Sequence, residues 1–245
     1  MFFQIIVTVG LRMPLINTNS GFFPARYRKR WYRFWMRQSS WSRTGRLAMR
    51  LASITAPPDM ESIPLAYINK NGWGYISPTA RLHHHALELG KNNFIGDNLV
   101  ILQRKGGGKI RLGDKVSLYK NCILETGQEG EILLGDQASI HHNSILKAYL
   151  SPIEIGSGVM IAANCTLYSY NHEIALGTPM REQPICSKGG IKIGDEAWLG
   201  TGVVVLDGAH IGKGAVIGAG SVVTGHIPDN AIAVGNPAKV VKQRK

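Results

Sequence analysis

The sequence predicts an all-β protein built mainly from a parallel β-helix of about six coils, with a basic, partly helical N-terminal extension and a short C-terminal tail. Aliphatic residues recur at every sixth position along much of the chain, and 29 of its 245 residues are glycine, most of them after residue 71. A period of six does not fit an amphipathic helix, whose apolar face recurs at three and four residues. It fits a coil in which each hexad forms one short strand and one turn, and three hexads close a triangle.

The N-terminal extension is expected to cover residues 1–86 and to carry most of the net charge of +12. Residues 1–58 contain ten Arg or Lys and no Asp or Glu, whereas the other 187 residues contain 18 basic and 16 acidic side chains. The basic charge therefore belongs to this segment and not to the β-helix. Because no base-stacking or base-reading motif accompanies the charge, we do not expect nucleic-acid binding.

Residues 26–50 are predicted to form an amphipathic helix. Aromatic side chains share one face of it and arginines another: Tyr27, Trp31, Phe34 and Trp35, and Arg26, Arg30, Arg33 and Arg37. Two interpretations stay open, because such a helix lies on an anionic membrane surface or packs against the β-helix. Residues 1–9 are apolar but too few to span a bilayer, and they lack the features of a signal peptide. We therefore expect a cytoplasmic protein, with peripheral contact at the inner face of the membrane under the first interpretation.

The β-helix is expected over residues 87–227, with the tail over 228–245. The predicted inward aliphatic residues form six groups of three: Leu89, Ile95 and Ile101; Leu112, Leu118 and Leu124; Leu134, Ile140 and Leu146; Ile155, Ile161 and Leu167; Ile193, Leu199 and Val205; Ile211, Ile217 and Val223. Cys122 and Cys165 lie four residues after an inward residue, where small side chains recur, so both are expected to pack inside. Together with Cys186, these cysteines show neither disulfide nor metal-binding spacing.

One interval between coils is much longer than the others. The first residues of successive coils are 23, 22, 21, 38 and 18 positions apart. The extra residues must leave the coil, since a slip along a strand would turn the aliphatic side chains outward. The long interval therefore predicts a loop over residues 168–190, and a loop of that length in a compact repeat is usually functional.

Motifs in and after this loop resemble those of the hexapeptide-repeat acyltransferases, especially the galactoside and maltose acetyltransferases and related polysaccharide O-acetyltransferases. They are Tyr170-Asn171-His172-Glu173, Trp198-Leu199-Gly200-Thr201, Gly218-Ala219-Gly220-Ser221 and Gly235-Asn236-Pro237-Ala238. The likeness covers roughly residues 89–242. It implies a left-handed β-helix, a homotrimer, and an enzyme that moves an acetyl group from acetyl-CoA to a hydroxyl of a sugar or polysaccharide precursor, with no metal.

The resemblance places the catalytic base at His172, in the loop that follows Ile161-Ala162-Ala163-Asn164. A sugar hydroxyl is too weak an acid to attack a thioester unaided, and an imidazole is suited to remove its proton near neutral pH. The same resemblance makes Asn143 a candidate that orients the acceptor. Glu125 is a candidate that binds the acceptor or orients His172.

For the donor, the resemblance implies that coenzyme A lies in a groove between neighbouring chains of a trimer. The candidate donor-binding residues are Trp198, Thr201, Ala219, Thr224, Lys239 and Lys242. The last three would lie near the nucleotide end, where cations suit phosphates. The chain departs from the family after Thr224, because Gly225 and His226 stand where a lysine is common. Two interpretations stay open: the phosphate contacts are weaker, or His226 takes the place of the lysine.

Three other interpretations use the same fold. The first is N-acylation of an amino sugar, which would need the same donor machinery. The second is a zinc enzyme similar to the gamma carbonic anhydrases, with His141, His142 and His172 as the histidines on offer. The third is a scaffold without catalytic activity, against which the retained loop histidine argues.

Overall fold

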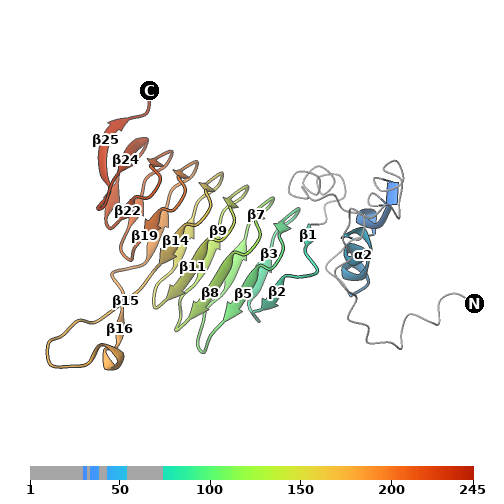
Figure 1. Ribbon diagram of the computed structural model, residues 1–245, viewed down its shortest axis with the longest axis horizontal. Coiled ribbons are helices and arrows are strands. Elements are labelled where there is room, and N and C mark those ends of the chain that lie inside the picture. The colour runs from blue at the N-terminus through green and yellow to red at the C-terminus, as the bar shows by residue number, and fades with distance from the viewer. Residues whose placement is uncertain (1–29, 32–33, 39–42, 54–73) are drawn as a thin grey trace, which may run out of the picture.

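The computed structural model describes residues 30–31, 34–38, 43–53 and 74–245, and its main body is a three-sided parallel β-helix (Figure 1). The first side, sheet A, contains β1 (Tyr75–Ile76), β4 (Phe94–Ile95), β7 (Ser117–Leu118), β10 (Ser139–Ile140), β13 (Met160–Ile161), β18 (Trp198–Leu199), β21 (Val216–Ile217), β24 (Ala231–Val234) and β25 (Lys239–Gln243). All neighbouring strands in sheet A are parallel except β24 and β25, which are antiparallel.

The other two sides each contain seven parallel strands. Sheet B contains β2 (Arg81–His83), β5 (Val100–Gln103), β8 (Ile123–Gly127), β11 (Ile145–Tyr149), β14 (Thr166–Tyr168), β19 (Val204–Val205) and β22 (Val222–Val223). Sheet C contains β3 (Leu87–Leu89), β6 (Ile110–Leu112), β9 (Ile132–Leu134), β12 (Ile153–Ile155), β17 (Ile191–Ile193), β20 (His210–Ile211) and β23 (His226–Ile227).

The predicted six-residue repeat is confirmed by the strand register. In sheet C, the predicted inward residues pair in order from Leu89 to Ile211, as Leu89, Leu112, Leu134, Ile155, Ile193 and Ile211. The last five are 4% exposed or less. Cys122 and Cys165 are fully buried, as predicted from their position in the hexad. The core is therefore a stack of aliphatic layers along the axis of the coil.

The β-helix begins earlier than the sequence predicted. The strands β1 and β2 precede β3, which contains Leu89, and complete a coil with it. The β-helix therefore has about seven coils in place of about six, and residues 74–86 belong to it. The repeat is less visible here because Ile76 is followed by Ser77, whereas glycine follows the equivalent residues Ile95, Leu199 and Ile217. The burial of Tyr75 and Ile76 beside later coils shows that the fold continues without the sequence signature.

Each end of the β-helix is covered by a different element. At the N-terminal end, helix α2 (Arg43–Ser53) buries Ala48, Met49 and Ala52, and the last two share one core cluster with Tyr75. At the C-terminal end, the predicted tail forms the antiparallel pair β24–β25. Such caps cover the apolar surface of the terminal coils, which have no further coil to pack on.

The predicted continuous helix over residues 26–50 is wrong in part. Helical residues are found up to Arg37, and the next helix begins at Arg43. Trp31 donates a hydrogen bond from Nε1 to the Leu51 carbonyl oxygen at 2.9 Å, and Trp35 packs against the core cluster. These two tryptophans therefore favour packing of the aromatic face over its contact with a membrane. Arg26, Tyr27 and Arg33 lie outside the described residues.

Candidate active site

The predicted loop is present and leaves the β-helix between sheets B and C. It follows β14, contains the antiparallel pair β15 (Asn171–His172) and β16 (Ile185–Cys186) with a 3₁₀ turn at Met180–Glu182, and returns at β17. Figure 1 shows it projecting away from the body of the coil. Tyr168, which was predicted to begin the loop, still belongs to β14.

His172 lies at the start of this projection and is exposed. Its Nδ1 atom is 3.4 Å from the carbonyl oxygen of Gln183 on the opposite arm. A carbonyl oxygen only accepts, so this contact favours the tautomer with hydrogen on Nδ1. In this tautomer Nε2 carries the lone pair that can take a proton.

Gln183 is 6% exposed and holds the loop from inside. Its Nε2 donates to the carbonyl oxygens of Ala175 at 2.8 Å and Thr178 at 3.0 Å. Both of these carbonyls belong to the segment of the loop between β15 and the 3₁₀ turn. One side chain therefore fixes the loop shape while its own backbone carbonyl faces the histidine, a role that the sequence did not predict.

The two ends of the loop are joined by hydrogen bonds of three residues. Ser169 lies at the start of the loop, Ser187 lies near its end, and Asp207 lies on the next coil. The Ser187 hydroxyl lies 2.9 Å from the Ser169 carbonyl oxygen and 2.8 Å from Asp207 Oδ1. The Asp207 carboxylate, 3% exposed, also accepts from the backbone N–H groups of Lys188 at 2.5 Å and Gly190 at 3.0 Å. Since an unpaired carboxylate is costly to bury, this charge is stable only with the loop foot in place. We name these three residues the loop latch; no sequence pattern pointed to them.

Glu125, a predicted site residue, is buried in the middle of β8. Its carboxylate accepts a hydrogen bond from the Tyr149 hydroxyl at 2.6 Å and pairs with Arg104 at 3.4 Å and Lys147 at 3.7 Å. Burial, and then the hydrogen bond and charge of Glu125, raise the pKa of Tyr149. The ring of Tyr149 lies 4.8 Å from that of Tyr170, which is two residues before His172. Glu125 thus reaches the loop through two tyrosines rather than by direct contact with the histidine.

Asn143, the predicted acceptor-orienting residue, lies at a corner between sheets A and B. It adopts a φ of 60°, and its side chain accepts from Asn121 Nδ2 at 3.1 Å and donates to Asn164 Oδ1 at 3.2 Å. Asparagine tolerates this left-handed conformation better than most residues. The ladder leaves one N–H of the Asn143 amide for another partner.

The predicted donor-binding residues lie on a different part of the surface. Trp198 is 48% exposed on the outer face of sheet A, and Thr201 and Ala219 follow on successive coils of the A–B corner, where Gly220 N donates to the Thr201 carbonyl oxygen. Thr224 is exposed after β22, and Lys239 and Lys242 are exposed on β25. His226 lies on the outer face of sheet C, with its ring 5.2 Å from that of His210.

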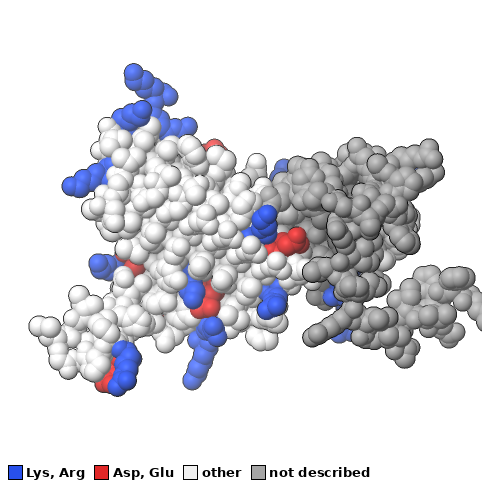
Figure 2. Space-filling model, viewed as in Figure 1, with Lys and Arg blue, Asp and Glu red and all other residues white. Residues whose placement is uncertain are grey.

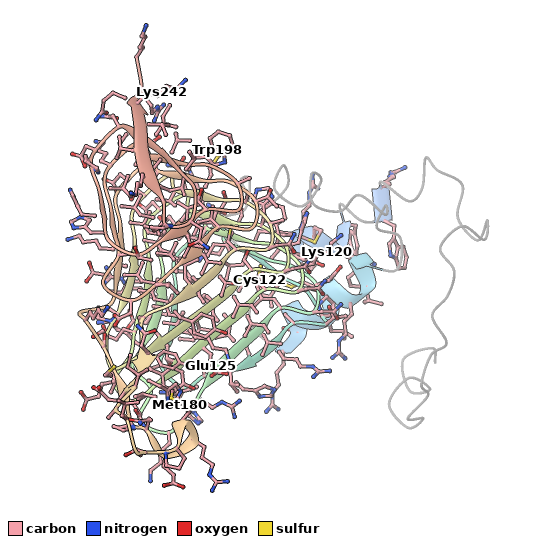
Figure 3. All side chains as sticks on the ribbon, turned by 60° about the vertical axis from the view of Figure 1, so that its left-hand side comes forward. Lys120, Cys122, Glu125, Met180, Trp198 and Lys242 are labelled. Carbon is pink, nitrogen blue, oxygen red and sulfur yellow. The ribbon has the colours of Figure 1, made fainter. Side chains whose placement is uncertain are left out.

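One chain therefore does not bring all predicted site residues together. Figure 3 shows Trp198 and Lys242 at one end of the view, and Glu125 and Met180 of the loop at the other. A groove of about 480 Å³ along sheet C is lined by Lys192, His210 and Lys213 among others, and by none of the predicted site residues.

The described residues contain no cluster of three or more His, Cys, Asp or Glu side chains that could hold a metal ion. His141 and His142 pack instead with Tyr119, at ring distances of 4.4 and 5.7 Å. The zinc-enzyme interpretation thus has no ligand set within the described part of the chain. Within the same part, no helix has the length and hydropathy needed to cross a membrane.

Residues 190–225 match the family model described as bacterial transferase hexapeptide (six repeats). The chain is 38% identical over 160 residues to the "Probable acetyltransferase Rv3034c" of Mycobacterium tuberculosis, a match that covers 65% of this chain and 45% of the relative. It is 39% identical over 95 residues to the galactoside O-acetyltransferase of Escherichia coli, covering 37% of this chain and 44% of that one. The chain thus spans less than half the length of these two relatives.

The fold is also found in solved structures. A mutant of AntD, an N-acyltransferase from Bacillus cereus in complex with dTDP-4-amino-4,6-dideoxyglucose and coenzyme A, superposes with a TM-score of 0.54 at 20% sequence identity. The superposition covers 66% of this chain and 86% of AntD. The chain therefore contains the transferase hexapeptide repeat, and it resembles the hexapeptide-repeat acyltransferases in sequence and in fold.

Proposed function

We propose that this protein is an acetyl-CoA-dependent O-acetyltransferase that acts on a hydroxyl of a sugar or polysaccharide precursor. The observation that carries the proposal is the setting of His172. The histidine is exposed on a projecting loop, its Nδ1 faces a backbone carbonyl, and the loop is held in place by buried Gln183 and Asp207. This is the arrangement that a general base needs, because one nitrogen is fixed and the other faces the reactants.

In the proposed reaction, Nε2 of His172 takes the proton of the acceptor hydroxyl as its oxygen attacks the thioester carbonyl carbon. The C–O bond that forms gives a tetrahedral intermediate. Its collapse breaks the C–S bond, and the imidazolium returns the proton to the departing sulfur of coenzyme A. Asn143 would orient the acceptor, and Glu125 would position the loop through Tyr149 and Tyr170.

The active form in this proposal is a homotrimer, in which His172 of one chain meets the donor residues of another. Exposed apolar side chains support contact between chains. The loop carries Ile174 at 80% exposure, Leu176 at 101% and Met180 at 56%. The outer face of sheet B carries a half-buried column of six β-branched residues: Val100, Ile123, Ile145, Thr166, Val204 and Val222. Coenzyme A would lie along Trp198, Thr201 and Ala219, with its phosphates toward Thr224, Lys239 and Lys242.

A cytoplasmic location with peripheral contact at the membrane is part of the same proposal. The basic N-terminal residues supply the attraction to anionic lipid, and a sugar precursor carried on a lipid would be presented at that surface. This places the enzyme beside the class of acceptor that we propose.

The direct test is release of free thiol from acetyl-CoA by the full chain in the presence of sugars. We expect turnover that depends on the acceptor and yields an O-acetyl ester, which mild base hydrolyses. An acetamide formed only with amino sugars would replace the proposal by N-acylation. No thiol release with any sugar or oligosaccharide acceptor would contradict acetyl transfer to sugars.

A further inference from the structure

A row of polar and aromatic side chains crosses the outer face of sheet B beside the start of the loop. Glu125, Lys147 and Tyr168 are register partners on neighbouring strands. They point to the outer face, because the residue directly before each is a fully buried leucine and side chains alternate along a strand. Tyr168 ends β14, and the loop follows it. We name these three residues, together with Tyr170, the tyrosine row.

The ring of Tyr168 is held by two neighbours in the tyrosine row. The Lys147 Nζ atom lies 6.0 Å from the centre of this ring, and the ring of Tyr170 meets it edge-on at a centroid distance of 5.8 Å. Tyr168 and Tyr170 are both half-buried, so part of each side chain stays open to solvent. A tyrosine held in this way has little rotamer freedom left to lose, and its exposed surface is preorganised for an apolar partner.

Hydrogen-bonding groups lie beside these rings. Lys147 and Arg104 both face the Glu125 carboxylate, at 3.7 and 3.4 Å, so the acid offsets part of their positive charge. The Arg104 side chain is 60% exposed, and its guanidinium has N–H groups besides the one that faces Glu125. Burial, and then the neighbouring Tyr168 and Glu125, raise the pKa of Tyr170, so its hydroxyl stays protonated and can donate. This mixture of donors and acceptors suits hydroxyl groups better than a strongly charged ligand.

A sugar ring matches both parts of the tyrosine row. One face of a pyranose consists of C–H groups, which pack against an aromatic ring, and its rim carries hydroxyl groups that donate and accept hydrogen bonds. We propose that Tyr168 stacks against the ring of the acceptor sugar, and that Lys147 and Tyr170 bind its hydroxyl groups. Because Tyr170 is two residues before His172, a sugar held here lies beside the start of the catalytic loop. The proposal rests on the proposed function, since it names the surface that binds the acceptor.

The experiment is saturation-transfer NMR between the full chain and the methyl pyranosides of glucose, galactose, mannose and N-acetylglucosamine, without coenzyme A. We expect at least one of them to bind, with the strongest transfer to the ring protons of one face, because these protons lie against Tyr168. Tyr168→Phe should bind nearly as well as the wild type. Tyr168→Leu keeps an apolar side chain but removes the aromatic ring, and it should bind about three- to tenfold more weakly.

The matched control is His210→Leu, which removes an exposed ring from the outer face of sheet C and should bind pyranosides as the wild type does. A wild type that binds none of the four pyranosides would overturn the proposal. Equal binding by Tyr168→Leu and Tyr168→Phe would overturn it as well, because apolar packing without an aromatic ring would then be sufficient.

Acceptor kinetics separate this proposal from the proposed function. For a pyranoside that is acetylated, Tyr168→Leu should raise its KM by the same factor and leave kcat and the KM for acetyl-CoA nearly unchanged. Binding that depends on Tyr168 without thiol release would contradict acetyl transfer and support the tyrosine row. Thiol release with an unchanged acceptor KM in Tyr168→Leu would contradict the tyrosine row and leave acetyl transfer in place.

Discussion

At the scale of single residues, the candidate site depends on side chains that never touch the reactants. Gln183 shapes the loop and places a carbonyl at Nδ1 of His172, and Asp207 ties the returning foot of the loop to the next coil. Both are more than nine-tenths buried. A misplacement of about 1 Å in a catalytic group can cost about 100-fold in rate, so such residues contribute to catalysis by position alone.

Asp207→Asn should lower kcat for thiol release by about tenfold and leave KM for acetyl-CoA nearly unchanged. The amide keeps the shape but replaces one acceptor of the loop latch with a donor, which must face Ser187 or a backbone N–H. Asp229→Asn is the matched control, because Asp229 accepts a hydrogen bond from Lys213 N at a corner without a loop. A similar loss of turnover in both variants would contradict the proposal that Asp207 positions the catalytic loop.

The cysteines give a second prediction at this scale. Burial raises the pKa of the Cys122 thiol to about 11 and also raises the pKa of Cys165. Both groups therefore stay protonated at pH 8, and neither is reachable by a reagent. A disulfide reagent should label at most one thiol per native chain, at half-exposed Cys186, and three after unfolding. Rapid labelling of all three in the native protein would contradict the inward packing.

At the scale of elements, the six-residue repeat predicted the positions of most coils. It also predicted where the loop leaves the β-helix, but not the contacts inside the loop. The inward residues from Leu89 to Val223 follow from periodicity, because an error of one residue would turn the aliphatic set outward. The first coil was missed because Ser77 follows the inward residue Ile76, where several later hexads carry glycine. Inside the loop no periodicity exists, so sequence could indicate His172 by likeness but not Gln183 as its partner. The link from Glu125 to Tyr170 joins separate coils, which sequence spacing does not show.

The asparagine ladder allows a test of the proposed acceptor contact. Asn143 and Asn121 are equivalent corner residues with φ near 60°, and both join the ladder. Glycine accepts this conformation without strain. Asn143→Gly should raise KM for the acceptor by about three- to tenfold, the effect of one lost hydrogen bond, and Asn121→Gly should not. An equal change in KM in both variants would show that Asn143 only stabilises the corner of the coil and does not contact the acceptor.

At the scale of the whole molecule, the chain is a capped β-helix. Basic and acidic side chains nearly balance after residue 58, since most of the net charge of +12 lies in residues 1–58. Figure 2 shows basic and acidic side chains spread over the β-helix, several of them side by side, in keeping with pairs such as Lys109–Glu131 and Lys192–Glu154. The histidine loop and the donor residues lie apart on this body. We therefore propose that the site forms between chains, and we expect the chains to meet at the exposed apolar residues of the loop.

Light scattering should give three times the mass of one chain for the wild type. Leu176→Asp should reduce this mass and lower thiol release, since a charge would enter an apolar contact between chains. In the isolated chain Leu176 is fully exposed, so the substitution should hardly change the folding of a monomer. Thr178→Asp adds the same charge at a nearby polar position and serves as the control. The mass of a single chain for the wild type would contradict the shared site.

The central claim is that His172 removes the proton from an acceptor hydroxyl as the hydroxyl oxygen attacks the thioester. The most direct measurement compares thiol release from acetyl-CoA by the wild type, His172→Ala and His210→Ala, each with an acceptor that the wild type uses. We expect His172→Ala to lose about 10²- to 10⁴-fold in kcat, and His210→Ala, which changes an exposed histidine of sheet C, to keep wild-type turnover. Turnover in His172→Ala equal to that of the wild type would contradict the account.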